Sequence, residues 1–456
     1  MSAVHDLKPQ QFYAETRQHE VHKMRMMMVD GNLTTNARTT ESGVSARALR
    51  DGYWGFAAAP VADAATLQRV ENKAMSNADA MSRFGKRNAL SLPSATHIGE
   101  QVFEGRSPWT PKQCNELLSE LHEWCKSTFP QLRSTRFILH DEKHIKHLKN
   151  SLGSDVISRI DRAAVYMMMI AEGDDGAPIE LMEILSCRGS IADLELTVDA
   201  LKPKLHTLYD HLQAKRHAVP ARAGTQQVII APELAGMLAH EAMGHPCEAD
   251  LVLGGSVAGD LVGKKIASDK ITMIDYAHSQ NGQSLMIPVI ADDEGTPSRD
   301  AVLIENGVLR QFMGSRETAA KLGIENSGSA RAYAPADEPL VRMRNTAILP
   351  GSDKLNDMIA DIEDGYLLLK TGNGQADSTT EFMFGISLGY EIRNGQLGPA
   401  IRDTTVSGSA LKVLSAVDAV SDDMHWECNG YCGKKQPMIV SLGGPALRTR
   451  LHMGGE

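Results

Sequence analysis

The stretch His240-Glu241-Ala242-Met243-Gly244-His245-Pro246 is the most informative part of this chain, because it places two imidazoles and a carboxylate within six residues. It follows an apolar segment at 227–230, which predicts a strand, and a predicted helix that begins near Pro232. In the usual helical zinc motif the two histidines stand four residues apart and overlie each other. Here they stand five apart, about 140° round a regular helix. We therefore expect the helix to unwind at Gly244, which tolerates left-handed backbone angles, and to end at Pro246.

The chemistry of this stretch favours a catalytic zinc site. Imidazoles bind zinc, and Glu241 can act as the general base that takes a proton from a metal-activated water. The competing interpretation is a helix that holds two histidines and a glutamate by chance. Catalytic zinc usually has three protein ligands, so one more is needed. The candidates by chemistry are Cys247, Glu248, Asp250, Cys428 and Cys432.

Glu248 and Asp250 have two further interpretations. Either carboxylate could hold a ligand imidazole in place from behind, because histidine ligands usually donate their second N–H to such a group. They could equally belong to an ordinary acidic loop.

Composition excludes several classes of protein. The chain has 456 residues, of which 42% are hydrophobic and 23% charged, so we expect a globular protein of two or three domains. Its net charge of -10 disfavours a nucleic-acid partner. No run of 18 apolar residues is present and residues 1–29 carry no apolar signal core, which predicts a cytoplasmic protein without a membrane partner. Six cysteines are too few for a disulfide framework.

The first half of the chain predicts paired strands, helices and more strands. Asp63 can cap a helix from Ala64 to about Met81, and Thr110, Pro111 and Gln113 form a capping box for a second helix. A helical stretch from about 194 to 216, with a break near Pro203, ends this half. The predicted strands are 24–29, 33–40, 44–49, 53–58, 137–139, 156–160, 163–171 and 179–185.

The second half is rich in turn signals. Asn306-Gly307 and Asn394-Gly395 predict hairpins, and 371–374 predicts a loop. Gly372 and Gly374, with Gln375 beside them, could let a substrate backbone approach closely, although a plain turn explains them equally well. We predict an α+β fold of two domains, 1–216 and 226–456, each built on mostly antiparallel sheet with packed helices.

Two other clusters have more than one interpretation. His140, His144 and His147 could form a second metal site, but their charged neighbours favour a solvated surface. Met167 to Met169 indicate a core strand rather than a peptide contact.

Motifs along most of the chain resemble those of the TldD/PmbA family of metalloproteases, on its metal-bearing TldD side. The HExxxH stretch with Glu248 and Asp250 resembles the family signature, and Cys432-Gly433-Lys434 resembles its C-terminal cysteine motif. Further segments resemble family segments in family order: Ser42 to Val44 with Arg47, 293–297, 304–307, 345–351 and 372–377. Cys247 departs from the pattern, which usually has an aliphatic residue or glycine there.

The resemblance implies a zinc ion (Zn²⁺) held by His240, His245 and Cys432, with Glu241 as the base. It implies a peptidase for unfolded or small peptides, including precursors of ribosomally made modified peptides. It also implies a two-subunit particle, either a homodimer or a heterodimer with a paralogous subunit, whose metal faces an internal cavity. We expect the peptide to lie extended along a sheet edge.

Two alternative functions remain at this stage. The chain could be a non-hydrolytic peptide-binding subunit, although a pure scaffold has no need for His240, Glu241, His245 and Cys432 together. It could also be a metalloenzyme that modifies a peptide without cleaving its backbone.

Overall fold

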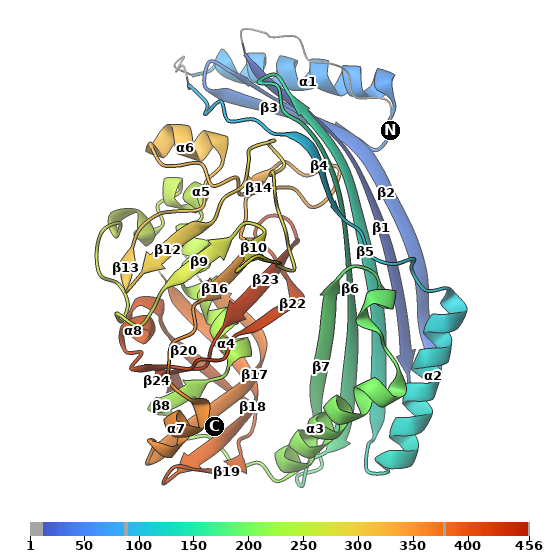
Figure 1. Ribbon diagram of the computed structural model, residues 1–456, viewed down its shortest axis with the longest axis vertical. Coiled ribbons are helices and arrows are strands. Elements are labelled where there is room, and N and C mark those ends of the chain that lie inside the picture. Colours follow the sequence, from blue (N-terminus) through green and yellow to red (C-terminus); the bar gives the residue numbers. More distant parts are fainter. Residues whose placement is uncertain (1–11, 86–89, 377–379, 455–456) are drawn as a thin grey trace.

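The computed structural model describes residues 12–85, 90–376 and 380–454. A long, curved sheet from the first half of the chain stands beside the second half, which is built from shorter strands and helices (Figure 1). The predicted α+β class is confirmed. Among the residues described, no helix is both long and apolar enough to cross a membrane.

The long sheet has seven strands in the order β3-β2-β1-β5-β6-β4, with β7 also on β6. All pairs are antiparallel except β4 with β6. Segments 33–40 and 44–49, predicted as two strands, are one, because the β1–β2 ladder runs on through Ser42 and Gly43. The same holds for 156–160 and 163–171. The strands are β1 Tyr13–Val29, β2 Asn32–Arg50, β3 Tyr53–Ala59, β4 Ile98–Phe103, β5 Ser134–Asn150, β6 Asp155–Glu172 and β7 Pro178–Arg188.

Helices α1 (Ala64–Ser82), α2 (Pro111–Thr128) and α3 (Val198–Arg216) accompany this sheet. The caps of α1 and α2 are confirmed: Asp63 accepts the N–H of Thr66, and Thr110 and Gln113 form the capping box. Helix α3 runs through Pro203, so the predicted break is wrong. The chain turns earlier, at Glu195, whose φ of 50° is left-handed.

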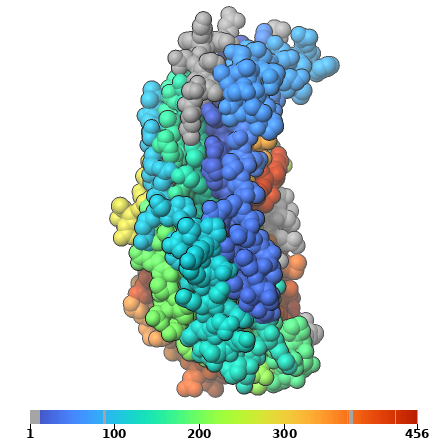
Figure 2. Space-filling model, turned by 90° about the vertical axis from the view of Figure 1, so that its right-hand side faces the viewer, coloured from blue at the N-terminus to red at the C-terminus, as the bar shows by residue number. Residues whose placement is uncertain are grey.

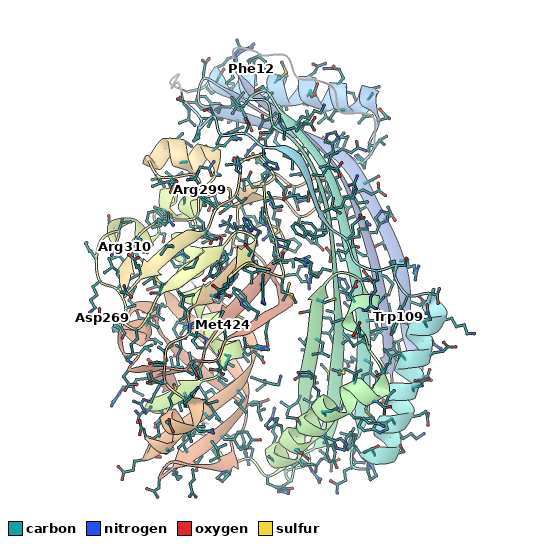
Figure 3. The ribbon with its side chains drawn as sticks, in the orientation of Figure 1. Phe12, Trp109, Asp269, Arg299, Arg310 and Met424 are labelled. Atoms are coloured by element: carbon teal, nitrogen blue, oxygen red, sulfur yellow. The ribbon has the colours of Figure 1, made fainter. Side chains whose placement is uncertain are left out.

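Helices α2 and α3 cover one face of the long sheet. Their leucines share a core with Met26, Met167 and Met169, so the core-strand interpretation of this methionine run is confirmed for the two alternate residues that point inward. Seen from the side of the long sheet, the surface is formed largely by the first half of the chain (Figure 2). Trp109, just before α2, lies on this outer side, whereas Asp269 and Arg310 lie at the opposite rim (Figure 3).

The other face of the long sheet lies against the second half of the chain. The side chains of His140, His144 and His147 are only 14%, 13% and 14% exposed. The predicted solvated surface is therefore wrong. Tyr431 and Tyr333 of the second half cover His140 and His144, whereas His147 lies on the opposite face of β5, 2.7 Å from Asp155 of β6.

The second half contains a small barrel. Its strands follow the order β17-β8-β24-β20-β18-β19, and a further pairing of β17 with β18 closes five of them. Residues 371–374 belong to β17, and Thr371 and Gly374 pair with β18 on either side of a register shift, so the predicted loop there is wrong. The elements are β8 Gly224–Ile230, β17 Asp364–Ala376, β18 Glu381–Arg393, β19 Gln396–Ala400, β20 Thr404–Ser409, β21 Ala419–Val420, β24 Leu447–Met453, α7 Leu355–Ala360 and α8 Ala410–Ser415.

A second sheet in this half has the order β13-β12-β9-β16-β23-β22. Both predicted hairpins are confirmed, with positive φ at Asn306-Gly307 and Asn394-Gly395. Helix α4 contacts β23, β17 and β22, and so it lies between this sheet and the barrel. The elements are α4 Pro232–Leu238, α5 Ala249–Leu253, α6 Arg316–Leu322, β9 Met273–Tyr276, β10 Ser279–Gln280, β11 Gln283–Ser284, β12 Ala301–Glu305, β13 Val308–Leu309, β14 Ala330–Arg331, β15 Leu340–Val341, β16 Asn345–Ile348, β22 His425–Cys432 and β23 Met438–Gly444.

Candidate metal centre

The two histidines are brought together by a π turn. Helix α4 continues into a π-helical segment, Ala239–Gly244, and the N–H of His245 donates to the carbonyl of His240, five residues back. Residues five apart therefore lie one above the other. The ring centroids of His240 and His245 are 4.8 Å apart. The predicted unwinding is wrong: the helix widens by one residue, which brings the rings together and keeps the backbone hydrogen-bonded.

Gly244 is required because there is no room for a Cβ atom, not because its backbone adopts a left-handed conformation. Its φ of -59° and ψ of -58° are right-handed, so the expected left-handed angle is absent here. A Cβ atom at this position would lie 2.3 Å from Sδ of Met343 and 3.1 Å from the carbonyl oxygen of Ala239. The glycine therefore permits close packing against Met343. The helix then ends in a 3₁₀ turn, His245–Cys247, that contains Pro246, as expected.

Cys432 completes the group of donor atoms. Its Sγ is 3.3 Å from Nε2 of His245, and ligand atoms of His240, His245 and Cys432 all lie within 4.8 Å of one another. No other group of His, Cys, Asp or Glu that could hold an ion occurs within the described ranges. A tetrahedral zinc ion with its usual bond lengths separates its donors by about 3.4–3.8 Å. The distance of 3.3 Å between Sγ of Cys432 and Nε2 of His245 is close to this spacing, and two imidazoles and a thiol are donor groups that zinc prefers.

The other candidate ligands are not members of this donor group. Cys247 and Cys428 are buried thiols: Cys247 belongs to the same apolar cluster as Cys432, and Cys428 belongs to a different one, which matches the small-side-chain interpretation of Cys428. Glu248 is also fully buried, and its Oε2 is 2.8 Å from Nδ1 of His245. His245 can donate from Nδ1 to this carboxylate, which leaves the lone pair of Nε2 on the side of Cys432. Asp250 does not contact the imidazole but pairs with Lys434 at 2.9 Å.

A buried arginine holds the strand that carries the sulfur. Nη2 of Arg342 donates to the carbonyl of Cys432 at 2.7 Å, and Nη1 donates to the carbonyls of Lys434 and Gln436. One guanidinium thus fixes the turn between β22 and β23. Sequence reasoning missed Arg342, because nothing local marks an arginine whose partners lie about ninety residues away.

The electrostatics of the centre favour a cation. Burial raises the pKa of the Cys432 thiol, but the imidazoles of His240 and His245 lower it further, to about 4. Burial lowers the pKa of His245, but Glu248 and Cys432 raise it to about 10. Burial raises the pKa of Glu248, but Lys434 and His245 lower it to about 2. The carboxylate of Glu248 and the thiolate of Cys432 thus lie on either side of the His245 imidazole, and this negative charge favours a bound divalent cation.

The remaining candidate residues surround this centre in different ways. Oε2 of Glu241 lies 3.9 Å from Nε2 of His245, and its side chain is 15% exposed, so water can reach it. Gly372 and Gly374 lie on β17, which contacts the π turn. A Cβ at Gly374 would meet the ring of Phe384 at 2.6 Å, whereas one at Gly372 would meet nothing within 4 Å. The side chain of Gln375 lies outside the described residues.

Comparison with known proteins defines the family. The sequence matches the PmbA/TldA metallopeptidase domain 1 over residues 14–78, and the PmbA/TldA metallopeptidase C-terminal domain over residues 223–455, just over half of the chain. A metalloprotease of Methanothermobacter thermautotrophicus is 31% identical, across 100% of this chain and 98% of its own length. The zinc metalloprotease TldD homolog of Saccharolobus solfataricus is 30% identical, across 91% and 90%.

A solved structure shares the fold. TldE from Thermococcus kodakarensis superposes with a TM-score of 0.77 over 96% of each chain, at 18% identity. The fold and the His-His-Cys centre define a metal-dependent peptidase scaffold. The chain belongs to the TldD/PmbA family and is a metalloprotease of that family.

Proposed function

We propose that this chain is a zinc-dependent peptidase that hydrolyses unfolded or small peptides, with precursors of ribosomally made modified peptides among its substrates. The observation that carries the proposal is the convergence of His240, His245 and Cys432 within 4.8 Å, with Glu241 beside them. The choice of zinc is supported by the nitrogen and sulfur donor set and by the name of the Saccharolobus relative.

In this proposal each residue of the centre has a defined task. His240, His245 and Cys432 hold the ion, which when bound polarises the peptide carbonyl and makes water a stronger acid. Glu241 takes the proton of the attacking water and passes it to the leaving amine. Glu248 keeps His245 in the tautomer that presents Nε2, and Arg342 keeps Cys432 in reach of both histidines.

The wider arrangement is proposed on other grounds. The division into domains 1–216 and 226–456 is supported by the long sheet, whose strands fall within residues 13–188, and by the barrel, whose first strand begins at Gly224. An extended peptide is proposed to pair with a strand edge near Gly372 and Gly374 of β17, the strand that contacts the π turn. A dimer with an identical or paralogous subunit and a cytoplasmic location remain predictions.

Metal analysis of cysteine variants tests the centre. Purified protein should contain about one zinc per chain, because a catalytic site takes a single ion. Cys432→Ala should lose it, whereas the matched controls Cys247→Ala and Cys428→Ala should keep it. Full zinc content in Cys432→Ala would refute the assignment of the third ligand.

Mass spectrometry of a treated peptide tests the reaction itself. Hydrolysis gives two fragments whose masses sum to that of the peptide plus one water. An intact backbone with a changed mass would favour peptide modification, and an unchanged but bound peptide would favour a binding subunit.

A further inference from the structure

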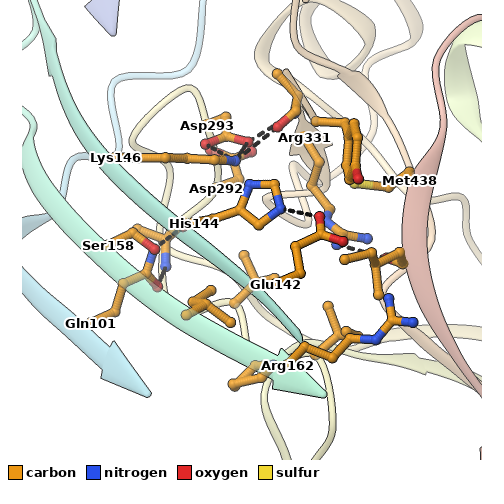
Figure 4. Close-up of a pocket in the computed structure, with 18 residues that line it drawn as sticks. Gln101, Glu142, His144, Lys146, Ser158, Arg162, Asp292, Asp293, Arg331 and Met438 are labelled. Atoms are coloured by element: carbon orange, nitrogen blue, oxygen red, sulfur yellow. Dashed lines mark hydrogen bonds and ion pairs between the residues drawn. The ribbon is translucent and has the colours of Figure 1, made fainter. Parts of the chain in front are cut away.

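A cavity of about 80 Å³, lined by apolar and charged side chains, lies between the long sheet and the second half of the chain (Figure 4). One wall comes from β5 and β6, with Glu142, Lys146 and Arg162, and the opposite wall includes Met438 of β23. Met438 pairs directly with Cys432 across the β22–β23 hairpin. The cavity and the metal centre therefore share one hairpin as a wall.

Two charged groups of this cavity already have strong partners. Lys146 pairs with Asp293 at 2.7 Å. Glu142 is bonded by His140 at 3.1 Å, His144 at 2.6 Å and the hydroxyl of Tyr431 at 2.7 Å. Neither group needs a ligand to satisfy its charge.

Arg162 differs from them. The residue is 3% exposed, and neither Nε nor Nη1 nor Nη2 makes a hydrogen bond to any described residue. Among the buried arginines that the structure describes, it alone has all three nitrogens in this state. Arg331, on the same cavity, instead donates to the carbonyls of Met343 and Ile439. A guanidinium buried without hydrogen bonds is costly, which indicates that a partner is missing.

The chemistry of that partner follows from the shape of the guanidinium. Its planar fork of N–H donors matches the two oxygens of a carboxylate. Its Cζ lies 5.2 Å from the centroid of the Tyr431 ring, a cation–π contact that holds the guanidinium beside β22. Tyr431 precedes Cys432 in β22, so the guanidinium and the sulfur donor lie beside neighbouring residues of one strand.

We propose that Arg162 binds a carboxylate of the peptide substrate in this cavity, so that the enzyme favours peptides with a negative charge a few residues from the scissile bond. This inference rests on the proposed peptidase function. Two sources offer the same chemistry: the C-terminal carboxylate of a short peptide, or the side chain of an aspartate or glutamate.

The test measures binding without turnover, in Glu241→Gln protein, by fluorescence anisotropy. Four labelled eight-residue peptides of otherwise identical sequence are compared: a free acid and an amide with glutamine at one internal position, and the same pair with glutamate there. We expect one kind of carboxylate to tighten binding roughly ten- to a hundredfold, as charge-assisted hydrogen bonds do. A preference for the free acid identifies the terminal carboxylate, and a preference for glutamate identifies the side chain.

Variants of Arg162 decide whether this residue carries the preference. In the same background, Arg162→Gln should abolish the preference and Arg162→Lys should retain part of it, because lysine keeps the charge but lacks the fork. The matched control is Arg159→Gln, which removes a β6 arginine that pairs with Glu100 at the surface. Circular dichroism and zinc content confirm that each variant is folded.

Two results would overturn the proposal: equal affinity for all four peptides, or an undiminished preference in Arg162→Gln. Failure of the peptidase function shows separately, as wild-type protein that cleaves none of the four peptides, and leaves the binding comparison readable.

Discussion

Glu241 follows a proposed metal ligand directly in the sequence, yet its carboxylate stands beside the donor atoms rather than among them. Helical geometry explains this, because adjacent residues of a helical turn point in different directions. Glu241 can therefore change without removing any donor atom.

We predict that Glu241→Gln keeps about one zinc per chain and loses activity roughly 100- to 10,000-fold, because general-base help is worth that much. Metal analysis and the rate of peptide cleavage measure the two effects. Glu305→Gln, at an exposed glutamate paired with Arg310, is the control. Unchanged cleavage by Glu241→Gln would exclude this residue as the base.

Asp141 gives a prediction about stability and pH. Burial raises the pKa of its carboxyl from 3.8 to about 6, although the N–H of Ile191 donates to it. Between about pH 4 and 6 the folded state therefore binds more protons than the unfolded state, and stability falls as the pH rises through this range. Above pH 6, ionised Asp141 lowers the free energy of unfolding by on the order of 3 kcal/mol.

Asp141→Asn should therefore raise the melting temperature at pH 7.5 and change it little at pH 4, because the asparagine cannot ionise. Thermal denaturation at both pH values measures this. Asp210→Asn, at an exposed position of α3, is the control and should show no such difference. A variant less stable than wild type at pH 7.5 would contradict the prediction.

At the scale of elements, local signals were sufficient wherever the structure depends on neighbouring residues. The caps of α1 and α2 and the hairpins at Asn306-Gly307 and Asn394-Gly395 follow from side chains within three residues. The π turn and the bulged end of β17 were missed. In the first, Gly244 packs closely against Met343, and in the second the strand pairs with β18; neither contact has a local signature.

The same distinction applies to the candidate site. The HExxxH stretch was recognisable from its own residues, and the family resemblance identified Cys432 as the third ligand. The sequence could not show that Arg342 holds the β22–β23 hairpin or that Arg162 is buried beside it. Both arginines acquire their roles only when β22 and β23 meet distant strands.

Gly244→Ala tests the π turn. The added Cβ would lie 2.3 Å from Sδ of Met343, so we expect a loss of about 1–3 kcal/mol of stability and reduced zinc content. Chemical denaturation and metal analysis measure these. Gly372→Ala is the matched control, because its Cβ would meet nothing within 4 Å and its effect should be small.

The double variant Gly244→Ala/Met343→Val distinguishes a clash with Met343 from a general intolerance of alanine at position 244. Met343→Val shortens the opposing side chain, so the cost of Gly244→Ala should be smaller in that background than in the wild type. Equal costs in both backgrounds would show that Met343 does not explain the glycine.

At the scale of the whole molecule, the two halves are joined next to the metal centre. Tyr431, adjacent to Cys432, donates to Glu142 of the long sheet, and Leu388 of the barrel packs into the core formed by α2 and α3. The first half therefore helps to position the strand that carries the sulfur, and the second half should not be a stable enzyme without it.

Assembly yields the last prediction. An open strand edge that binds peptides must be protected from other strands, and a second subunit is one way to enclose it. We expect light scattering to show a dimer, or a dimer only with a paralogous partner, and we expect unfolded protein to be cleaved while its folded form resists. A monomer that is fully active alone, or equal cleavage of both forms, would contradict an enclosed site.

The π turn at the candidate metal centre also affects how the motif is recognised in gene sequences. The spacing of His240 and His245 differs by a single codon from the four-residue spacing found on regular zinc-binding helices. Deleting that codon would restore the common pattern in the sequence, but Met343 and Glu248 would still be set for the longer turn. A search for the four-residue pattern therefore overlooks this chain, although the chemistry of its donors is the same.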